Sequence, residues 1–177
     1  MIRSDRLILR NWKDADSAPF ATMCADVDVM EHLGGPIGRA ESDVIAARIS
    51  ETAQKHGHCF WAIERENDGM FLGFCGLRRG GHPGTSVPDE LEIGWRLSRS
   101  AWGQGYAREA AAAALEWGWR NTSASRIAAW TVPANLRSWG LMQRLGMVHR
   151  PDLDFDHPNF PDGHPLRRHL VYVIERP

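Results

Sequence analysis

Two glycines directly before an alanine-rich run form the stretch of this sequence best suited to binding chemistry. Gly103 and Gly105 precede a segment with alanines at every position of 110–114. Glycine permits a sharp turn and close backbone approach, whereas alanine favours helix. The first N–H groups of a helix have no partner inside it, and they bind anions, phosphate groups above all. The pattern therefore predicts a phosphate-binding helix start; the structural alternative is a glycine pair that only lets the chain turn.

Two common nucleotide-binding motifs do not fit this stretch. A dinucleotide fingerprint requires a third glycine where Arg108 stands, and an acidic residue at the end of the next strand, which 126–132 does not supply. A loop for nucleoside triphosphates requires Gly-Lys-Ser/Thr, and the chain lacks it here. The remaining interpretation is a loop that cradles the pyrophosphate of an acyl-coenzyme A.

Apolar periodicity and turn residues predict how strands and helices alternate around this loop. We expect strands at 6–12, 59–66, 70–79, 90–97, 126–132, from 147 onward and at 169–175. We expect helices at 14–26, 40–57, about 104–121 and 134–146, and an acidic, proline-rich loop at 151–168. In the second helix, Val44, Ile45, Ile49 and Ala53 share an apolar face. This order predicts an α/β protein with one mixed sheet, in a single domain covering 1–177.

Composition excludes several classes of protein. The chain has 177 residues and a formal net charge of -1, which argues against a nucleic-acid-binding surface or a polybasic membrane anchor. The N-terminal stretch is too charged for a signal peptide, and no apolar run reaches the length of a membrane span. Cys24, Cys59 and Cys75 are odd in number and lack metal-ligand spacing. We therefore expect a reduced, cytoplasmic protein with buried cysteines and no metal ion.

Three segments of the chain stand out, at 5–16, 102–107 ("WGQGYA") and 135–147 ("NLRSWGLMQRLGM"). Together they give the chain a resemblance to the GNAT superfamily of acetyl-coenzyme A-dependent N-acetyltransferases. "WGQGYA" at 102–107 resembles the family's pyrophosphate motif, with Trp102 in place of its first Arg or Gln. "DRLILRNWKDAD" at 5–16 and "NLRSWGLMQRLGM" at 135–147 resemble the branch that acetylates the N-termini of ribosomal proteins. The resemblance covers nearly the whole chain. It implies a GNAT fold, with a central twisted mixed sheet of about six to seven strands flanked by about four helices.

The same resemblance implies how acetyl-CoA binds. The sheet is expected to splay between its fourth and fifth strands, 90–97 and 126–132, with a bulge near Gly94 that admits the pantetheine arm. Leu97 would hydrogen-bond that arm through its backbone, and the N–H groups of Gln104, Gly105 and Ala107 would hold the pyrophosphate. The full set of implied cofactor-binding residues is Trp95, Arg96, Leu97, Trp102, Gly103, Gln104, Gly105, Tyr106, Ala107, Arg108, Asn135, Ser138 and Met142.

Acetyl transfer to an amine requires a base, a polarised carbonyl and a route for the leaving thiolate. Glu92 is the first candidate base and Glu90, on the same face of its strand, the second; either acts directly or through a water. A backbone N–H within 95–97 would polarise the carbonyl. Many family members use a Tyr seven residues after the motif's Asn to protonate the thiolate, but that position is Met142 here. Ser138 takes this role in our interpretation. The structural alternatives are a solvent-facing Glu92 and an ordinary helix serine.

The acceptor is the least determined part of the sequence interpretation. The preferred acceptor is a protein N-terminal amine of the ribosomal type, and the alternatives are a polyamine or aminoglycoside, or a CoA-binding module without turnover. By resemblance, the loop 151–168 borders the acceptor site, where its acids would attract a cationic amine and His157 and His164 are further candidate bases. Trp95 and Trp139 would flank the acetyl group or acceptor. The family is compatible with a homodimer, although no stretch of the sequence specifies one.

Overall fold

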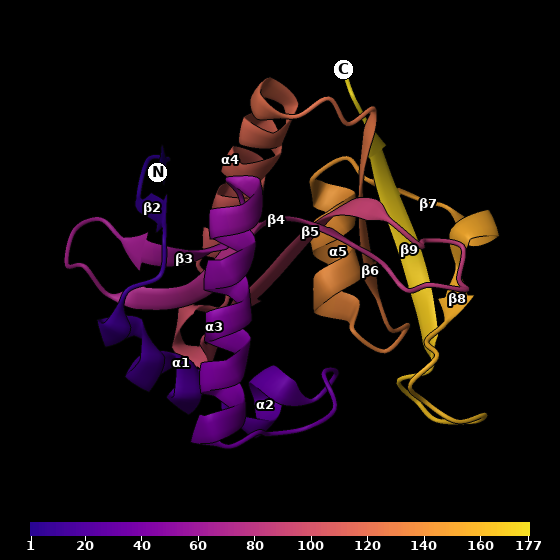
Figure 1. The fold of residues 1–177 in the computed structure, drawn as a ribbon, viewed down its shortest axis with the longest axis horizontal. Helices are drawn as coiled ribbons and strands as arrows, with labels where there is room; N and C mark the ends of the chain where they lie inside the picture. Colours follow the sequence, from indigo (N-terminus) through magenta and orange to yellow (C-terminus); the bar gives the residue numbers. More distant parts are fainter.

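The structure, a computed structural model, describes all residues from 1 to 177. Its strands form a nine-stranded sheet in the order β1-β2-β3-β4-β5-β6-β9-β7, with β8 paired to β9. Most neighbours are antiparallel, and β5 and β6 are parallel (Figure 1). The strands are β1 (Ile2–Arg3), β2 (Leu7–Arg10), β3 (Phe60–Arg65), β4 (Phe71–Gly80), β5 (Glu90–Leu97), β6 (Arg126–Thr131), β7 (Val148–His149), β8 (Phe155–Asp156) and β9 (Arg168–Glu175).

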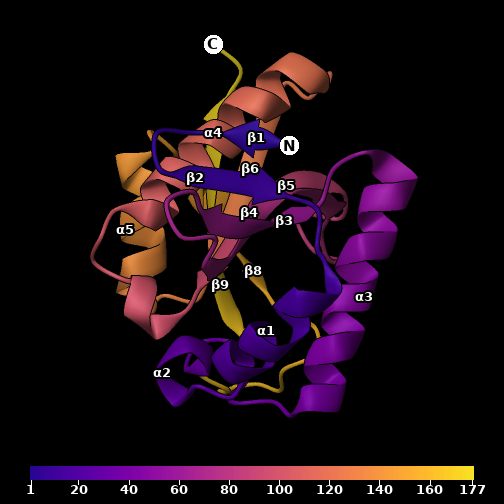
Figure 2. The same cartoon turned by 90° about the vertical axis from the view of Figure 1, so that its left-hand side faces the viewer.

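Five helices surround the sheet. They are α1 (Ser17–Cys24), α2 (Val27–Met30), α3 (Arg39–His56), α4 (Tyr106–Asn121) and α5 (Leu136–Arg144), with 3-10 turns at Asp14–Asp16, Arg99–Ala101 and Pro151–Leu153. Figure 2 shows α1 and α2 below β2, β3 and β4, and α4 above them. The expected mixed α/β fold is therefore confirmed. The strand count is higher than predicted because β1 and β8 are two-residue strands, too short to produce an apolar periodicity. The strand expected from 147 onward is present as β7.

Local signals placed most element ends within a few residues. Gly57 ends α3 in the left-handed conformation, with φ of 71°, and Gly146 follows α5 with φ of 82°. Two expectations fail. Val44 is 51% exposed, so the apolar face of α3 rests on Ile45 and Ile49 instead. The segment expected to be a plain loop at 151–168 contains a 3-10 turn and β8.

The alanine run brings α4 close to the sheet. Ala110, Ala111 and Ala114 are fully buried in a core cluster of 23 residues that includes Leu77 and Ile93 of β4 and β5. A Cβ on Gly118 would lie 2.6 Å from Cδ1 of Leu77, so even a methyl group would crowd this contact. The small side chains thus fix the height of α4 above the sheet, in addition to favouring helix.

The central feature of the sheet is the separation of β5 from β6. β4 and β5 pair without interruption from Gly73↔Leu97 to Gly80↔Glu90, whereas β5 and β6 pair only at Glu92↔Ala128. The predicted splay between these strands is confirmed. The predicted bulge near Gly94 is wrong, because the β4–β5 register is regular there. Gly94 instead leaves space for Phe60, whose ring would lie 2.8 Å from a Cβ at this position.

Two further sequence expectations can be compared with the structure. All three cysteines are buried and unpaired, as predicted. None of the helices combines the length and the apolar character needed to cross a membrane.

Replacing Gly73 with alanine should destabilise the protein strongly. Gly73 has φ of +135°, and a Cβ there would lie 2.2 Å from the carbonyl oxygen of Arg96 across the β4–β5 pair. We expect Gly73→Ala to lower the free energy of unfolding by about 3 kcal/mol or more, because strain and a backbone clash add. Urea unfolding of both variants provides the measurement. Gly69→Ala is the control: its φ of +69° is also positive but its surroundings are open, so the expected loss is only about 1 kcal/mol. Equal losses would contradict the proposed clash.

Candidate active site

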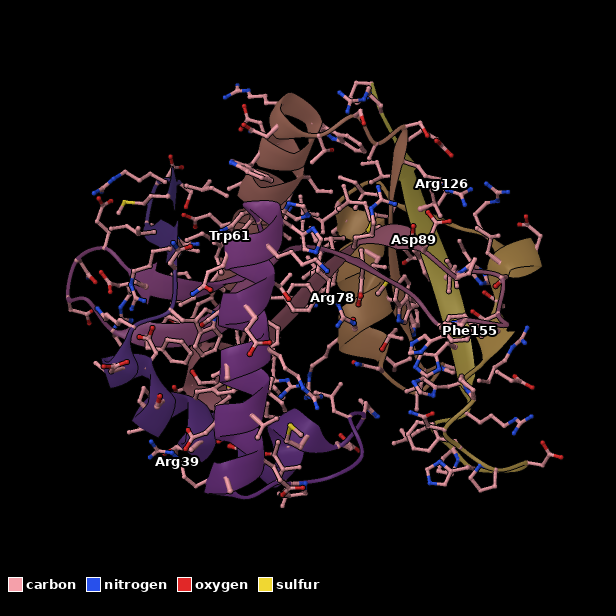
Figure 3. All side chains as sticks on the ribbon, viewed as in Figure 1. Arg39, Trp61, Arg78, Asp89, Arg126 and Phe155 are labelled. Atoms are coloured by element: carbon pink, nitrogen blue, oxygen red, sulfur yellow. The ribbon has the colours of Figure 1, made fainter.

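A cavity of about 840 Å³ opens where β5 and β6 diverge. Its walls come from β4 and β5, the α2 region, the turn before α4, and the first turns of α4 and α5. Figure 3 shows Arg78, one of the lining residues, in the middle of the molecule, with Asp89 and Phe155 to its right on the side of β8 and β9. The cavity joins the predicted phosphate loop at one end to Glu92 at the other.

In the predicted phosphate loop, residues 102–108, the amides of 104–108 have no hydrogen-bond partner, as the sequence predicts. Gly105 adopts φ of 82° and precedes α4, and the N–H of Glu109 is the first to donate into the helix, to the Gly105 carbonyl at 3.1 Å. No oxygen of the chain accepts from the amides of 104–108. Gly103, Gly105 and the residues at 106–108 line the cavity. A helix start with bare amides and a positive dipole end fits a pyrophosphate.

Gln104 is the one member of the predicted loop that does not line the cavity. Its side-chain amide donates to the Ser100 carbonyl at 2.8 Å, and its own carbonyl accepts from Nη1 of Arg6 at 3.1 Å. Only the backbone N–H of Gln104 is left for the predicted contact with a ligand.

Glu109 holds the start of α4 against the N-terminal strands. Its carboxylate accepts from Oγ of Ser4 at 2.8 Å, from the backbone N–H of Arg6 at 2.8 Å and from Nε of Arg6 at 2.7 Å. Burial alone would raise the pKa of Glu109, but these hydrogen bonds lower it below its ordinary value. The carboxylate is therefore a structural anchor for the loop as well as a favourable charge near the helix dipole.

Trp102, the departure from the family motif, ties the phosphate loop to β5. Its indole N–H donates to the Leu97 carbonyl at 2.9 Å. The guanidinium groups of Arg99 and Arg137 lie 4.8 and 4.7 Å from its ring centroid. The Leu97 carbonyl is thus already engaged, so the predicted backbone contact of Leu97 with pantetheine is restricted to its N–H.

Alternation along β5 decides which backbone groups face the cavity. The backbone N–H of Ser98 donates to the Leu72 carbonyl at 2.8 Å. Because every second residue of an antiparallel strand directs its N–H to the same neighbouring strand, the amides of Gly94 and Arg96 are also directed to β4. The amides of Trp95 and Leu97 are directed to the β6 side, where the pairing has ended. These two remain candidates for contacts with pantetheine and the acetyl carbonyl. Of the three backbone N–H groups within 95–97, that of Arg96 is therefore directed to β4 and away from the open edge.

Glu92 is a buried carboxylate in the cavity wall. Glu92 as a whole is 9% exposed, and its Oε2 accepts a hydrogen bond from Nε of Arg78 at 2.8 Å. Burial raises the pKa of Glu92, and the neighbouring Arg78 opposes that rise. Leu91 and Ile93 on the other face are buried as well, so the solvent-facing alternative for Glu92 is wrong.

The second candidate base does not reach the cavity. Glu90 forms an ion pair with Arg126, with one N···O distance of 3.2 Å, and lies outside the cavity lining. This pair links the start of β5 to β6 near their only register match. Glu90 therefore has a structural position, and Glu92 is the carboxylate of β5 in the cavity.

The start of α5 supplies one hydroxyl to the cavity. Oδ1 of Asn135 accepts from the Ser138 backbone N–H at 3.2 Å, and Nδ2 of Asn135 donates to Oγ1 of Thr131 at 3.0 Å, so Asn135 caps its helix. The Ser138 hydroxyl makes no hydrogen bond within the chain and Ser138 lines the cavity. Met142, at the position of the missing tyrosine, is buried in the same wall.

The acidic loop at 151–168 does not border the cavity, contrary to expectation. None of its residues belongs to the lining. Its acids pair locally: Asp154 with His149 at 3.0 Å, and Asp162 with Arg167 at 2.8 Å. His157 packs against His82 with ring centroids 4.2 Å apart, and His164 stacks on Phe160, so neither is placed as a base.

The two tryptophans expected near the acetyl group or acceptor differ in their position relative to the cavity. The indole N–H of Trp139 donates to the Pro133 carbonyl at 3.1 Å and Trp139 lies outside the lining, whereas Trp95 belongs to it. No group of three or more His, Cys, Asp or Glu side chains is arranged to hold a metal ion.

Sequence reasoning did not place the side chain of Arg96 in the cavity with the aromatic residues beside it. Arg96 lines the cavity with Phe60 and Phe74. The available signal was alternation: Arg96 is four residues after Glu92 and so shares its face of β5. Phe60 belongs to β3 and gives no such signal, because only the packing of three strands brings it over Gly94.

Comparison with known proteins agrees with this geometry. Residues 6–148 match the family model described as "Acetyltransferase (GNAT) domain". YkkB of Bacillus subtilis (strain 168), described as an uncharacterized protein, is 31% identical over 151 residues, covering 81% of this chain and 83% of YkkB. A GNAT-family acetyltransferase from Bacillus anthracis superimposes with a TM-score of 0.80 at 22% identity, over 99% of this chain and 98% of that one.

Two of the similar solved structures contain coenzyme A. Spermidine N-acetyltransferase from Vibrio cholerae, in complex with CoA and spermine, has a TM-score of 0.74 at 14% identity and covers 97% of this chain and 96% of its own. RimL, a ribosomal L7/L12 alpha-N-protein acetyltransferase in complex with coenzyme A, has a TM-score of 0.73 at 15% identity and covers 97% and 95%. At these identities the likeness concerns the fold, and the ribosomal branch is one of several neighbours.

Removing the Glu109 carboxylate should loosen the phosphate loop. We expect Glu109→Ala to lower the free energy of unfolding by about 2 kcal/mol, because Ser4 and Arg6 lose their shared acceptor. Glu116→Ala on the same helix is the matched control; Glu116 forms an exposed pair with Arg120, and its loss should cost less than about 0.5 kcal/mol. Chemical denaturation compares the two. If both variants are equally stable, Glu109 does not anchor α4.

Proposed function

Because the chain belongs to the GNAT acetyltransferase family, we propose that it transfers the acetyl group of acetyl-CoA to a primary amine by direct attack on the thioester. The observation that carries this proposal is the single cavity that joins the bare amides of α4 to the buried carboxylate of Glu92. The amides are suited to binding a diphosphate, and the carboxylate is suited to accepting a proton. Between them runs the unpaired edge of β5.

Charge in the cavity wall supports acetyl-CoA as the co-substrate. Arg108 in the first turn of α4, Arg137 in the first turn of α5 and Arg144 at the end of α5 line the cavity, and no carboxylate of the chain pairs with any of them. Together with the amides of 104–108, they offer cationic and N–H partners for the phosphate groups of coenzyme A. When bound, acetyl-CoA supplies the thioester carbon that the amine attacks.

Glu92 removes the proton from the attacking amine in this proposal. An aliphatic amine is mostly protonated at neutral pH, so its lone pair must be released before it can attack. A buried carboxylate with a raised pKa is a better proton acceptor than an exposed one. Arg78 keeps the carboxylate oriented through its hydrogen bond to Oε2.

The other two requirements are met by β5 and α5. The amides of Trp95 and Leu97 face the open edge of β5 and would stabilise negative charge that develops on the acetyl oxygen. The Ser138 hydroxyl would donate to the leaving sulfur; a thiol with a pKa of roughly 8.5 needs no strong acid. Glu92 takes one proton from the ammonium group, the neutral amine adds to the thioester carbon, and the C–S bond breaks as the carbonyl forms again. The nitrogen then loses its second proton, which reaches the leaving thiolate through the Ser138 hydroxyl and gives the amide and free coenzyme A. Glu92 returns its proton to water.

The predicted acceptor, a protein N-terminal amine of the ribosomal type, is the finer part of this proposal. It has support from the three sequence motifs at 5–16, 102–107 and 135–147. The argument from an acidic groove no longer supports it, because the acids of 151–168 lie outside the cavity. The charged residues of the cavity wall favour a different class of acceptor.

Substituting Glu92 should separate catalysis from cofactor binding. We expect Glu92→Gln to lower kcat by about 100-fold or more, while the affinity for coenzyme A is unchanged. In the wild type the rate should fall as the pH falls through the pKa of Glu92, which lies above the ordinary 4.5, because only the carboxylate accepts a proton. This acidic limb should be absent in the variant. The rate is followed as release of free thiol from acetyl-CoA.

Glu90→Gln is the control for this experiment, since Glu90 is on the same face of β5 but outside the cavity. It should retain a near wild-type rate and pH profile. A Glu92→Gln enzyme with full rate at every pH would show that another group is the base. A protein that binds coenzyme A but releases no thiol with any amine would instead be a binding module without turnover.

Blocking the phosphate loop should abolish cofactor binding. Gly105→Val puts a side chain into the turn that presents the amides of α4, at a φ of +82° and with its Cβ 3.4 Å from Nη2 of Arg6. We therefore expect the Kd for coenzyme A to rise at least about 100-fold, as measured by calorimetry. Gly84→Val controls for backbone strain, because Gly84 has nearly the same φ, +83° against +82°, and lies in open surroundings away from the cavity. A wild-type protein that shows no saturable heat with millimolar coenzyme A would refute the proposed function.

A further inference from the structure

Arg96 places a positive charge in the cavity without a negative partner. Its Nη1 lies 3.5 Å from Sγ of Cys24, and its guanidinium lies 5.4 Å from the centroid of the Phe74 ring. Its Nε is buried and has no hydrogen-bond partner. Burial raises the pKa of the Cys24 thiol, so this sulfur is neutral and cannot act as the counter-ion.

A partly buried arginine with a buried, unpaired Nε is costly to the folded protein. Arginine has five N–H donors in a planar fork, and here only one of them contacts an acceptor within the chain. Desolvation lowers the pKa of Arg96, because the charged guanidinium loses contact with water. Groups that break the rule of paired buried charges are concentrated at functional sites, where a ligand supplies the missing partner.

The position of Arg96 relates it to the proposed base. Glu92 and Arg96 share one face of β5, about 13 Å apart along the strand at roughly 3.3 Å per residue. Gly94 lies between them and leaves room for Phe60, which stacks on Phe74 with ring centroids 5.4 Å apart. The cavity wall is therefore carboxylate, aromatic surface and free guanidinium, in that order.

The remaining charges of the cavity wall agree with an anionic ligand. Five arginines line it, namely Arg78, Arg96, Arg108, Arg137 and Arg144, against the two carboxylates of Asp28 and Glu92. Both carboxylates already have arginine partners, Arg99 for Asp28 and Arg78 for Glu92. A polycationic acceptor such as a polyamine would find no free carboxylate there.

We propose that the acceptor is a primary amine that also carries a carboxylate, which Arg96 binds while the amine lies at Glu92 and the intervening chain rests on Phe60 and Phe74. This inference rests on the proposed acetyl transfer and specifies its substrate class. Arg96 is then a specificity-determining residue, because its fork is complementary to a carboxylate. The carboxylate can belong to an amino acid with several carbon atoms between its amine and its carboxylate, or to an acidic residue near the N-terminus of a peptide.

Matched acceptors test this inference. One arm compares glycine, 4-aminobutyrate and 6-aminohexanoate with their carboxamides, and the other compares peptides that differ only by Glu or Gln at their second residue. Spermidine is included as the polycationic acceptor. We expect kcat/KM to be about 10- to 100-fold higher for the carboxylate member of at least one pair, through KM. The arm in which the preference occurs identifies the source of the carboxylate.

Arg96→Gln should abolish that preference, so that the carboxylate and the carboxamide member of each pair have equal kcat/KM. Arg79→Gln is the control, because Arg79 is an exposed arginine of β4 that pairs with Asp89 outside the cavity, and its selectivity should equal that of the wild type. Thermal unfolding supplies a second readout. Arg96→Gln should be at least as stable as the wild type, since it removes an unpaired buried charge.

The outcomes distinguish this inference from the proposed function. Acetylation of amines with no carboxylate preference, or with a preference for spermidine, overturns the role of Arg96 and leaves acetyl transfer intact. An Arg96→Gln protein that is less stable and slower with every acceptor would show that Arg96 has a structural role. No thiol release with any acceptor overturns both proposals.

Discussion

The structure depends on the requirement that backbone N–H and C=O groups find hydrogen-bond partners. β5 satisfies this requirement fully towards β4 but only at Glu92↔Ala128 towards β6. A few residues later, α4 begins with amides that have no acceptor in the chain. Two sets of unsatisfied donors thus face one cavity. A ligand with amide and phosphate groups along its length can satisfy both, which is why the cavity fits acetyl-CoA better than a compact ligand.

The elements around the cavity hold these donors in place by close packing rather than by their own propensities. Because its buried alanines have small side chains and Gly118 has none, α4 lies directly on β4 and β5. Glu109 ties its first turn to β1 and β2, and Trp102 ties the preceding loop to the end of β5. A binding site formed by backbone amides needs this rigidity, because a backbone that shifts loses several contacts together.

Charge in the cavity is kept at a cost to stability. Glu92 is buried beside Arg78, and Arg96 is partly buried beside a neutral thiol. Neither arrangement stabilises the fold as well as apolar side chains of similar size would. The two groups are complementary to the two ends of an amino acid-like molecule. The same low-dielectric surroundings that disfavour these charges strengthen their interaction with a bound ligand.

The sequence by itself determined what depends on short-range interactions. The order of the main strands and helices, the glycine turn into α4, the cap formed by Asn135 and the end of α3 at Gly57 could all be predicted, because each depends on neighbours within a few residues. Only the tertiary structure decided which side chains share the cavity. It placed the acidic loop at 151–168 outside the cavity and Arg96 beside Cys24. These placements depend on strand pairing and packing between residues far apart in the chain, whose partners no local pattern of residues specifies.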